Sequence, residues 1–386
     1  MSTEEKRTKE PLPRGFWIVW STVALDMVGF GIVVPILGRY ADRFGASGLE
    51  VGLLFASFSI AQLIFSPILG RWSDRVGRKP VLVISLFGSA FGSLILAFAG
   101  SLPVLLLGRI IDGASGASVV VAQGAVTDMA PPHQRARVIG LLSMAFGVGF
   151  IVGPAIGGLA ALGGPHVPFL LAGMLALSNA IAAIIRLPET RKEGSAPATR
   201  VRLKGKWTSK FVLVAFLTTL PWAGFESTFS IFGKARFDLT EASTAGVFLF
   251  VGVLTAIMHG ALIGPLTARF GSARLLHGGL VSIACGLLLM ASAITWPVLF
   301  LSLAFLVFGS GLVNPSLTAL VTNSADDSRR GEVLGVQQSA NALARTIGPP
   351  LAGLTFDVIG VGSQFALGAL VVLIAAFVAM TRINER

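Results

Sequence analysis

Long apolar runs recur along this chain from one end to the other, and they limit what it can fold into. An apolar run of about 20 residues is long enough to cross the hydrocarbon core of a membrane as a helix. Charged residues make up only 13% of the chain, about half of their usual share in a soluble domain. The sequence therefore predicts an all-α membrane protein.

The apolar runs predict twelve transmembrane helices, at 15–37, 49–70, 80–99, 103–129, 138–162, 167–186, 210–233, 243–265, 275–294, 297–322, 333–357 and 363–381. A polar stretch at 187–209 separates the first six spans from the last six. The predicted organisation is a tail at 1–14, a six-helix bundle at 15–186, a linker at 187–209, a second six-helix bundle at 210–382 and a tail at 383–386.

Basic residues gather on one side of the predicted membrane. The side that carries both termini holds 24 of the 30 Lys and Arg residues. An excess of Lys and Arg in short loops marks the cytoplasmic side, so we expect both termini in the cytoplasm and a location in a bacterial inner membrane. This distribution accounts for the net charge of +11 without nucleic acid. We expect a monomer surrounded by the lipid bilayer.

The two halves of the chain resemble each other. Residues 138–159 (VIGLLSMAFGVGFIVGPAIGGL) align with 333–354 (VLGVQQSANALARTIGPPLAGL) at a constant offset of 195 residues, which pairs Gly153 with Gly348 and Pro154 with Pro349. Internal repeats of this kind are typical of transporters whose binding site lies near the membrane midplane between two bundles.

Four motifs in the sequence are similar to those of one particular family of membrane proteins. They are LDMVGFGIVVPIL (25–37), GRWSDRVGRKP (70–80), LLLGRIIDGASGA (105–117) and GVGFIVGPAIGG (147–158). In their order and spacing they resemble the major facilitator superfamily, and within it the drug:proton antiporters that include tetracycline-resistance and multidrug efflux pumps. The resemblance covers essentially the whole chain. It implies a fold of two pseudo-symmetric six-helix bundles. It also implies a transporter that exports amphipathic compounds in exchange for protons by alternating access.

Ionisable side chains inside the predicted spans are the candidate proton-coupling residues. A charge at membrane depth costs about 2.5–3.5 kcal/mol and normally faces the bundle interior. Helix 4 carries Arg109 and Asp112 at a spacing that allows them to pair, and the resemblance ties this arginine to proton coupling. Asp26 and Glu226 are lone acids in helices 1 and 7. The alternative interpretation is that these groups only hold helices together.

The resemblance also implies which helices surround the substrate, namely 1, 4, 7 and 10. The candidate cavity residues in these helices are Trp222, Phe225, Phe229, Gln123 and Asn314. The aromatic members recur at helical spacing along one face, which is also compatible with core or lipid packing. Arg345 is a further charge in helix 11 to which the sequence assigns no role.

Two motifs predict parts of the structure that take part in conformational change. By resemblance, the loop between helices 2 and 3 pairs with the end of helix 4 and touches the start of helix 11, forming a cytoplasmic latch of Gly70, Asp74, Arg75, Gly77, Arg78 and Asp128. The helix-5 stretch removes side chains and so allows close helix packing. By resemblance it is an antiporter motif, made of Gly149, Gly153, Pro154, Gly157 and Gly158.

Several classes of function find no support in the sequence. There is no phosphate-binding G-x-x-x-x-G-K-[ST] segment, so ATP does not drive transport. No catalytic array, metal-ligand spacing or cofactor motif is present, and Cys285 is the only cysteine. Helix 9 lacks the acid that tetracycline pumps of this type carry. The open alternatives are a lipid or lysolipid carrier on the same fold, a proton-coupled nutrient importer and a non-transporting membrane sensor or scaffold.

Overall fold

The computed structural model describes the chain except for residues 1–9, 132–133, 192–205, 324–329 and 381–386. Its regular structure over the described residues is helical. The first half of the chain forms α2 (Phe16–Asp42), α3 (Gly48–Val76), α4 (Arg78–Ala97), α5 (Leu102–Ser115), α6 (Ser118–Met129), α7 (Arg135–Ala161) and α8 (Val167–Arg186). The second half forms α9 (Lys206–Phe237), α10 (Glu241–Ile257), η2 (Met258–Leu262), α11 (Ile263–Phe270), α12 (Ser272–Ala291), α13 (Trp296–Asn323), α14 (Arg330–Val358) and α15 (Ser363–Met380).

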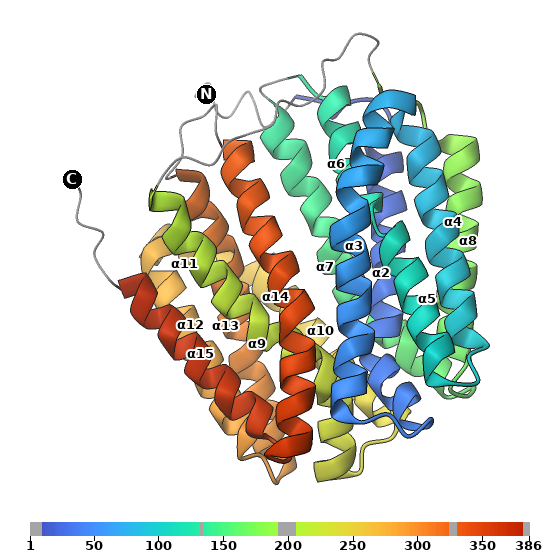
Figure 1. Cartoon of the computed structure of the whole chain (residues 1–386). Coiled ribbons are helices and arrows are strands. Elements are labelled where there is room, and N and C mark those ends of the chain that lie inside the picture. Colours follow the sequence, from blue (N-terminus) through green and yellow to red (C-terminus); the bar gives the residue numbers. More distant parts are fainter. Residues whose placement is uncertain (1–9, 132–133, 192–205, 324–329, 381–386) are drawn as a thin grey trace.

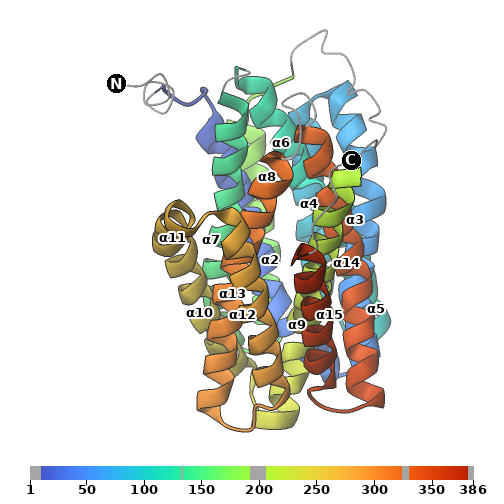
Figure 2. The ribbon, with the colours of Figure 1, turned by 90° about the vertical axis from the view of Figure 1, so that its left-hand side faces the viewer.

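These helices make two bundles that stand side by side, one from each half of the chain (Figure 1). Turning the molecule shows the helices running roughly parallel along its long axis (Figure 2). Over the described residues, 11 helical segments are long and apolar enough to cross a membrane. The helix α14 has 29 residues and completes the set, but its charged residues, among them Arg345 and Asp357, make it more polar. The predicted fold class is confirmed.

Two of the predicted spans contain a break in the regular α-helix. Residues 103–129, predicted as one helix, form α5 and α6, with a turn at Gly116 and Ala117 between them. The Gln62 amide of α3 donates a hydrogen bond to the carbonyl oxygen of Gly116, at 3.0 Å. This contact occupies a carbonyl group that the broken helix leaves without its usual partner. The eighth span consists of α10, the π-helical turn η2 and α11.

The two bundles contact each other at the end of the molecule that lies away from the chain termini (Figure 1). The Lys234 ammonium of α9 lies 2.6 Å from the Asp42 carboxylate at the end of α2. Asp357, at the end of α14, accepts hydrogen bonds from the backbone N–H groups of Gly48 and Leu49, both at 2.8 Å. A carboxylate is favoured at a helix N-terminus, where unpaired N–H groups and the helix dipole attract negative charge. Asp357 therefore binds α3 of the other bundle.

Glycines allow the same contact to be close. A Cβ atom added at Gly353 of α14 would lie 2.0 Å from the carbonyl oxygen of Gly48, and one at Gly52 of α3 would lie 2.4 Å from that of Pro349. Real Cβ atoms do not approach other atoms so closely, so α3 and α14 meet backbone to backbone here. The bundles are thus closed against each other at this end.

Candidate functional site

Asp26 lies midway along α2 and belongs to a polar cluster in the first bundle. Its carboxylate accepts a hydrogen bond from the hydroxyl group of Ser118. Ser118 is the first residue of α6, so the break between α5 and α6 places this hydroxyl beside Asp26. The Asp112 carboxylate is close enough to Asp26 to interact with it electrostatically. The structure thereby joins the predicted residues of helices 1 and 4 in one cluster.

Arg109 is fixed in the centre of the first bundle. Its side chain is 1% exposed and its guanidinium lies 3.3 Å from the Asp112 carboxylate. The same guanidinium lies over the ring of Phe58, 4.2 Å from the ring centroid, and Nε donates to the carbonyl oxygen of Leu54 at 3.5 Å. Arg109 is therefore the counter-charge of Asp112 and is held on α3, which leaves it little freedom to reach a solute.

The glycines of the helix-5 motif pack α7 against α2 beside Asp26. A Cβ atom at Gly149 would lie 2.5 Å from Met27, and one at Gly153 would lie 2.6 Å from the backbone of Gly31. Gly157 approaches Ile32 in the same way, at 3.0 Å. Pro154 is buried in this contact, and Gly158 is half-buried. The motif thus brings α7 against the residues that directly follow the lone acid of α2.

A second polar cluster lies in the other bundle and is centred on Glu226 of α9. Glu226 accepts a hydrogen bond from the Trp222 indole N–H at 2.8 Å, and its second carboxylate oxygen lies 3.4 Å from the Arg345 guanidinium of α14. The sequence assigned no role to Arg345, and its pairing with Glu226 was not predicted. The signal was present, because Glu226 and Arg345 are lone opposite charges in spans of the same half.

The predicted cavity residues divide into two groups. Phe225 and Phe229 are 2% and 0% exposed, and they pack on Phe248 and Phe365 in the core of the second bundle. The aromatic stripe thus turns toward the bundle core, which is the alternative that the sequence left open, and cavity lining by these two residues stays a prediction. Trp222 and Gln123 are half-buried, and Asn314 is exposed in the middle of α13.

Arg78 is the centre of the predicted latch. Its guanidinium lies 2.5 Å from the Asp74 carboxylate and donates to Asp128, at the end of α6, at 2.8 Å. Arg75 takes part through its carbonyl oxygen, which accepts a hydrogen bond from Arg191. Gly70 packs against Val120 at an ordinary distance. The predicted helix 11 corresponds to α14 (Arg330–Val358), and its contact with the latch stays a prediction.

Glu189 adds to the latch a contact that the sequence did not indicate. Its carboxylate accepts hydrogen bonds from the backbone N–H groups of Arg78 (2.9 Å) and Lys79 (3.2 Å), at the N-terminus of α4. Partial burial alone would raise the pKa of Glu189, but hydrogen bonds from the backbone of Arg191, Arg78, Lys79 and Thr190 together lower it below its ordinary value. The residue stood at the edge of the predicted linker, and only the fold brings it to α4.

Gly77 joins α3 to α4 with φ 113° and ψ 156°, a conformation that is essentially restricted to glycine. A Cβ atom here would also lie 2.4 Å from the Glu189 carboxylate. We expect Gly77→Ala to destabilise the protein by about 1–3 kcal/mol, seen as a lower unfolding temperature of the detergent-purified protein. Gly70→Ala is the matched control, since its Cβ would meet only Val120, at 3.6 Å. Equal unfolding temperatures for the two variants would contradict this account of the loop.

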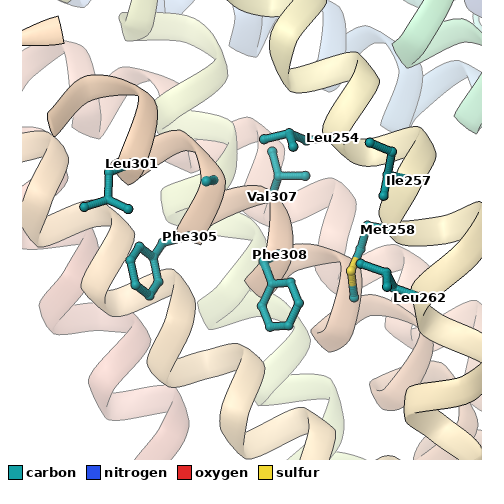
Figure 3. A pocket seen from close by; sticks show the side chains of 9 residues that line it. Leu254, Ile257, Met258, Leu262, Leu301, Phe305, Val307 and Phe308 are labelled. Carbon is teal, nitrogen blue, oxygen red and sulfur yellow. The ribbon is translucent and has the colours of Figure 1, made fainter. Parts of the chain in front are cut away.

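An apolar pocket lies between α10, η2 and α13, apart from both polar clusters. It has a volume of about 290 Å³ and is lined by Leu254, Ile257, Met258, Leu262, Leu301, Ala304, Phe305, Val307 and Phe308. Figure 3 shows these side chains converging from the two sides of the pocket. Asn314 follows Val307 of the pocket lining by seven residues, so at 100° per residue it lies about two turns further along the same face of α13.

The similarity of the chain to known proteins shows its family. The family model of the Major Facilitator Superfamily matches residues 19–325 and 260–386. The chain belongs to the major facilitator superfamily. A relative, the class C tetracycline resistance protein of Escherichia coli, is 33% identical over 346 residues, covering 86% of this chain and 87% of the relative. The quinolone resistance protein NorA of Staphylococcus aureus (strain MSSA476) is 26% identical over 351 residues, covering 89% of this chain and 90% of NorA.

Solved structures show the same superfamily fold. A bacterial homologue of the human lysosomal transporter Spinster, in an inward-facing and occupied conformation, aligns with a TM-score of 0.77 and 16% identity over 94% of this chain and 95% of that one. The human organic anion transporter MFSD10 aligns with a TM-score of 0.72 and 23% identity, covering 98% of this chain and 100% of that one. This superfamily member is thus a multi-pass membrane protein with the fold of these transporters.

Proposed function

We propose that the protein exports small amphipathic compounds, including drugs, in exchange for protons. The observation that carries the proposal is a membrane-embedded carboxylate in each bundle, Asp26 and Glu226, each held by a neutral hydrogen-bond donor. Burial favours the protonated form of such a group, while exposure or a nearby cation favours the charged form. A conformational change that moves the carboxylate between these surroundings would make it bind a proton in one state and release it in the other. Relatives named for resistance to tetracycline and quinolones support export as the direction.

The contacts between the bundles suggest how access alternates. With the termini in the cytoplasm, as the basic residues indicate, the contacts of Asp42 with Lys234 and of Asp357 with α3 close the outer side. The inward-facing state is then the one described. Opening the outer side would separate these pairs, while the latch around Arg78 would secure the cytoplasmic side. No step requires ATP or a cofactor.

The proton gradient is a sufficient source of energy for this exchange. Moving one charge across 100 mV releases about 2.3 kcal/mol. Since about 1.36 kcal/mol corresponds to a factor of ten, one proton sustains roughly a fifty-fold outward gradient of an uncharged solute per 100 mV.

A flux assay in cells separates this function from its rivals. Cells that produce the protein are loaded with ethidium, and its loss is followed with and without an uncoupler. We expect faster loss than in cells without the protein, and we expect the uncoupler to abolish the difference. Accumulation of ethidium would instead indicate an importer, and no flux would exclude ethidium export and leave a lipid carrier or a scaffold.

The apolar pocket favours a lipid or lysolipid carrier as the second candidate function. Its lining of aliphatic and aromatic side chains suits an acyl chain better than a polar solute. This candidate is tested with fluorescent lysolipid in vesicles that contain the purified protein. Protein-dependent movement of lysolipid between leaflets, without ethidium flux, would replace drug export by lipid transport.

A further inference from the structure

Arg345 is an accessible cation in the middle of a membrane-spanning helix. Its side chain is 38% exposed, whereas that of Arg109, the intramembrane cation of the first bundle, is 1% exposed. A charge at membrane depth is costly, and such residues usually mark the path of a substrate or ion. Ion pairing alone gives no reason for the partial exposure of Arg345.

Its position on α14 shows which way the exposed side faces. Pro349 and Gly353 follow Arg345 by four and eight residues, so the three share one helical stripe. Pro349 packs on Gly52, and Gly353 packs on Gly48, both in α3 of the other bundle. Arg345 therefore lies on the face of α14 that is turned toward the first bundle, one helical turn before the residues at which the bundles close. Its exposed surface opens between the bundles and not toward the lipid.

The guanidinium has hydrogen-bonding capacity to spare. It carries five N–H donors in a planar fork that matches a carboxylate. In the described part of the chain its acceptor is Glu226, reached by one nitrogen at 3.4 Å. The other carboxylate oxygen of Glu226 accepts a hydrogen bond from the Trp222 indole, so Trp222 and Arg345 contact the same carboxylate. One turn away on α14, the side chain of Asn341 accepts a hydrogen bond from Thr219 at 3.0 Å.

We propose that Arg345 is an anion-binding subsite for the substrate. It would take the carboxylate, or a similar anionic group, of an aromatic zwitterion or anion, whose rings would lie beside Trp222. Glu226 is then an internal competitor for the same guanidinium. The subsite rests on the proposed export function and adds to it a preference for substrates that carry an anionic group, so ethidium, which carries none, tests export alone.

Rhodamine 110 and rhodamine 123 test the subsite directly, because the second dye is the methyl ester of the first and lacks its free carboxylate. Binding of each dye to the full-length protein is measured in detergent by fluorescence anisotropy. A hydrogen bond to a charged group contributes about 1.5–3 kcal/mol, so we expect Arg345→Gln to weaken rhodamine 110 binding roughly tenfold or more. Rhodamine 123 binding should change less than about twofold. Glu226→Gln should strengthen rhodamine 110 binding.

Two further variants test whether the effect is specific to Arg345 and to the shape of its guanidinium group. Arg269→Gln removes an exposed arginine that stacks on Phe270 at the end of α11, and it should bind both dyes as the wild type does. Arg345→Lys keeps the charge without the planar fork and should bind rhodamine 110 with intermediate affinity. Equal effects of Arg345→Gln on both dyes, or none on either, would overturn the subsite.

The binding assay does not depend on transport, so the two proposals fail separately. Proton-dependent ethidium export without discrimination between the dyes removes the subsite and leaves the export function. Discrimination that depends on Arg345, in a protein that exports neither dye nor ethidium, removes the export function and leaves the subsite.

Discussion

Asp26→Asn is expected to abolish energy-dependent efflux while the protein remains folded. Asparagine can still accept the hydrogen bond from Ser118, but it can neither take up nor release a proton. Exchange of substrate for protons should therefore be lost, because the residue that would carry the proton no longer titrates. The efflux of ethidium from energised cells measures this loss.

The same variant separates proton coupling from a structural role. If Asp26 carries the proton, downhill equilibration of ethidium across vesicles should survive in Asp26→Asn while uphill transport disappears. Asp238→Asn is the matched control, since Asp238 is exposed at the end of α9 and should keep both activities. Unchanged uphill transport in Asp26→Asn would remove Asp26 from the mechanism.

Two glycine-to-alanine changes in α7 are expected to have opposite effects on stability. Alanine stabilises a helix interior by about 0.5–1 kcal/mol relative to glycine, and at Gly147 an added Cβ meets nothing within 4 Å. At Gly153 the Cβ would lie 2.6 Å from the backbone of Gly31, which cannot rotate away. Overpacking of this kind costs about 1–3 kcal/mol, so Gly153→Ala should destabilise the protein and Gly147→Ala should not.

The unfolding temperature of the purified protein measures this contrast, and the efflux rate adds a second readout. Because the Gly153 contact lies close to Asp26, we expect Gly153→Ala to slow efflux as well, whereas Gly147→Ala should retain the wild-type rate. Equal stability of the two variants would show that close packing of α7 on α2 is not the role of the helix-5 motif.

The sequence predicts most of the fold because hydropathy and charge bias act locally. The limits of the spans are less accurate, as polar turns extend the helices beyond the apolar runs: α2 ends at Asp42 and not at 37, and α3 continues to Val76. The break at Gly116 was missed because a run of small residues remains apolar on average. Its effect on the site is large, since it brings Ser118 to Asp26.

Long-range pairs in the site were harder to predict than its individual members. The pairing of Arg109 with Asp112 follows from their spacing on one helix, whereas Glu226 and Arg345 are 119 residues apart. Asp357 shows the same difficulty, since its partners lie at the start of α3 in the other bundle. Helical periodicity tells which face a residue occupies but not which helix that face meets. The burial of Phe225 and Phe229 could not be predicted, because it depends on which helices their face of α9 meets.

Transport by the purified protein in vesicles with an acidic lumen tests the central claim most directly. Protons leaving the lumen should drive ethidium inward, whichever way the protein is inserted. We predict accumulation above the equilibrium level, and its loss when nigericin collapses the pH gradient. An ethidium level that is the same with and without the gradient, or accumulation only when the lumen is alkaline, would contradict proton-coupled export.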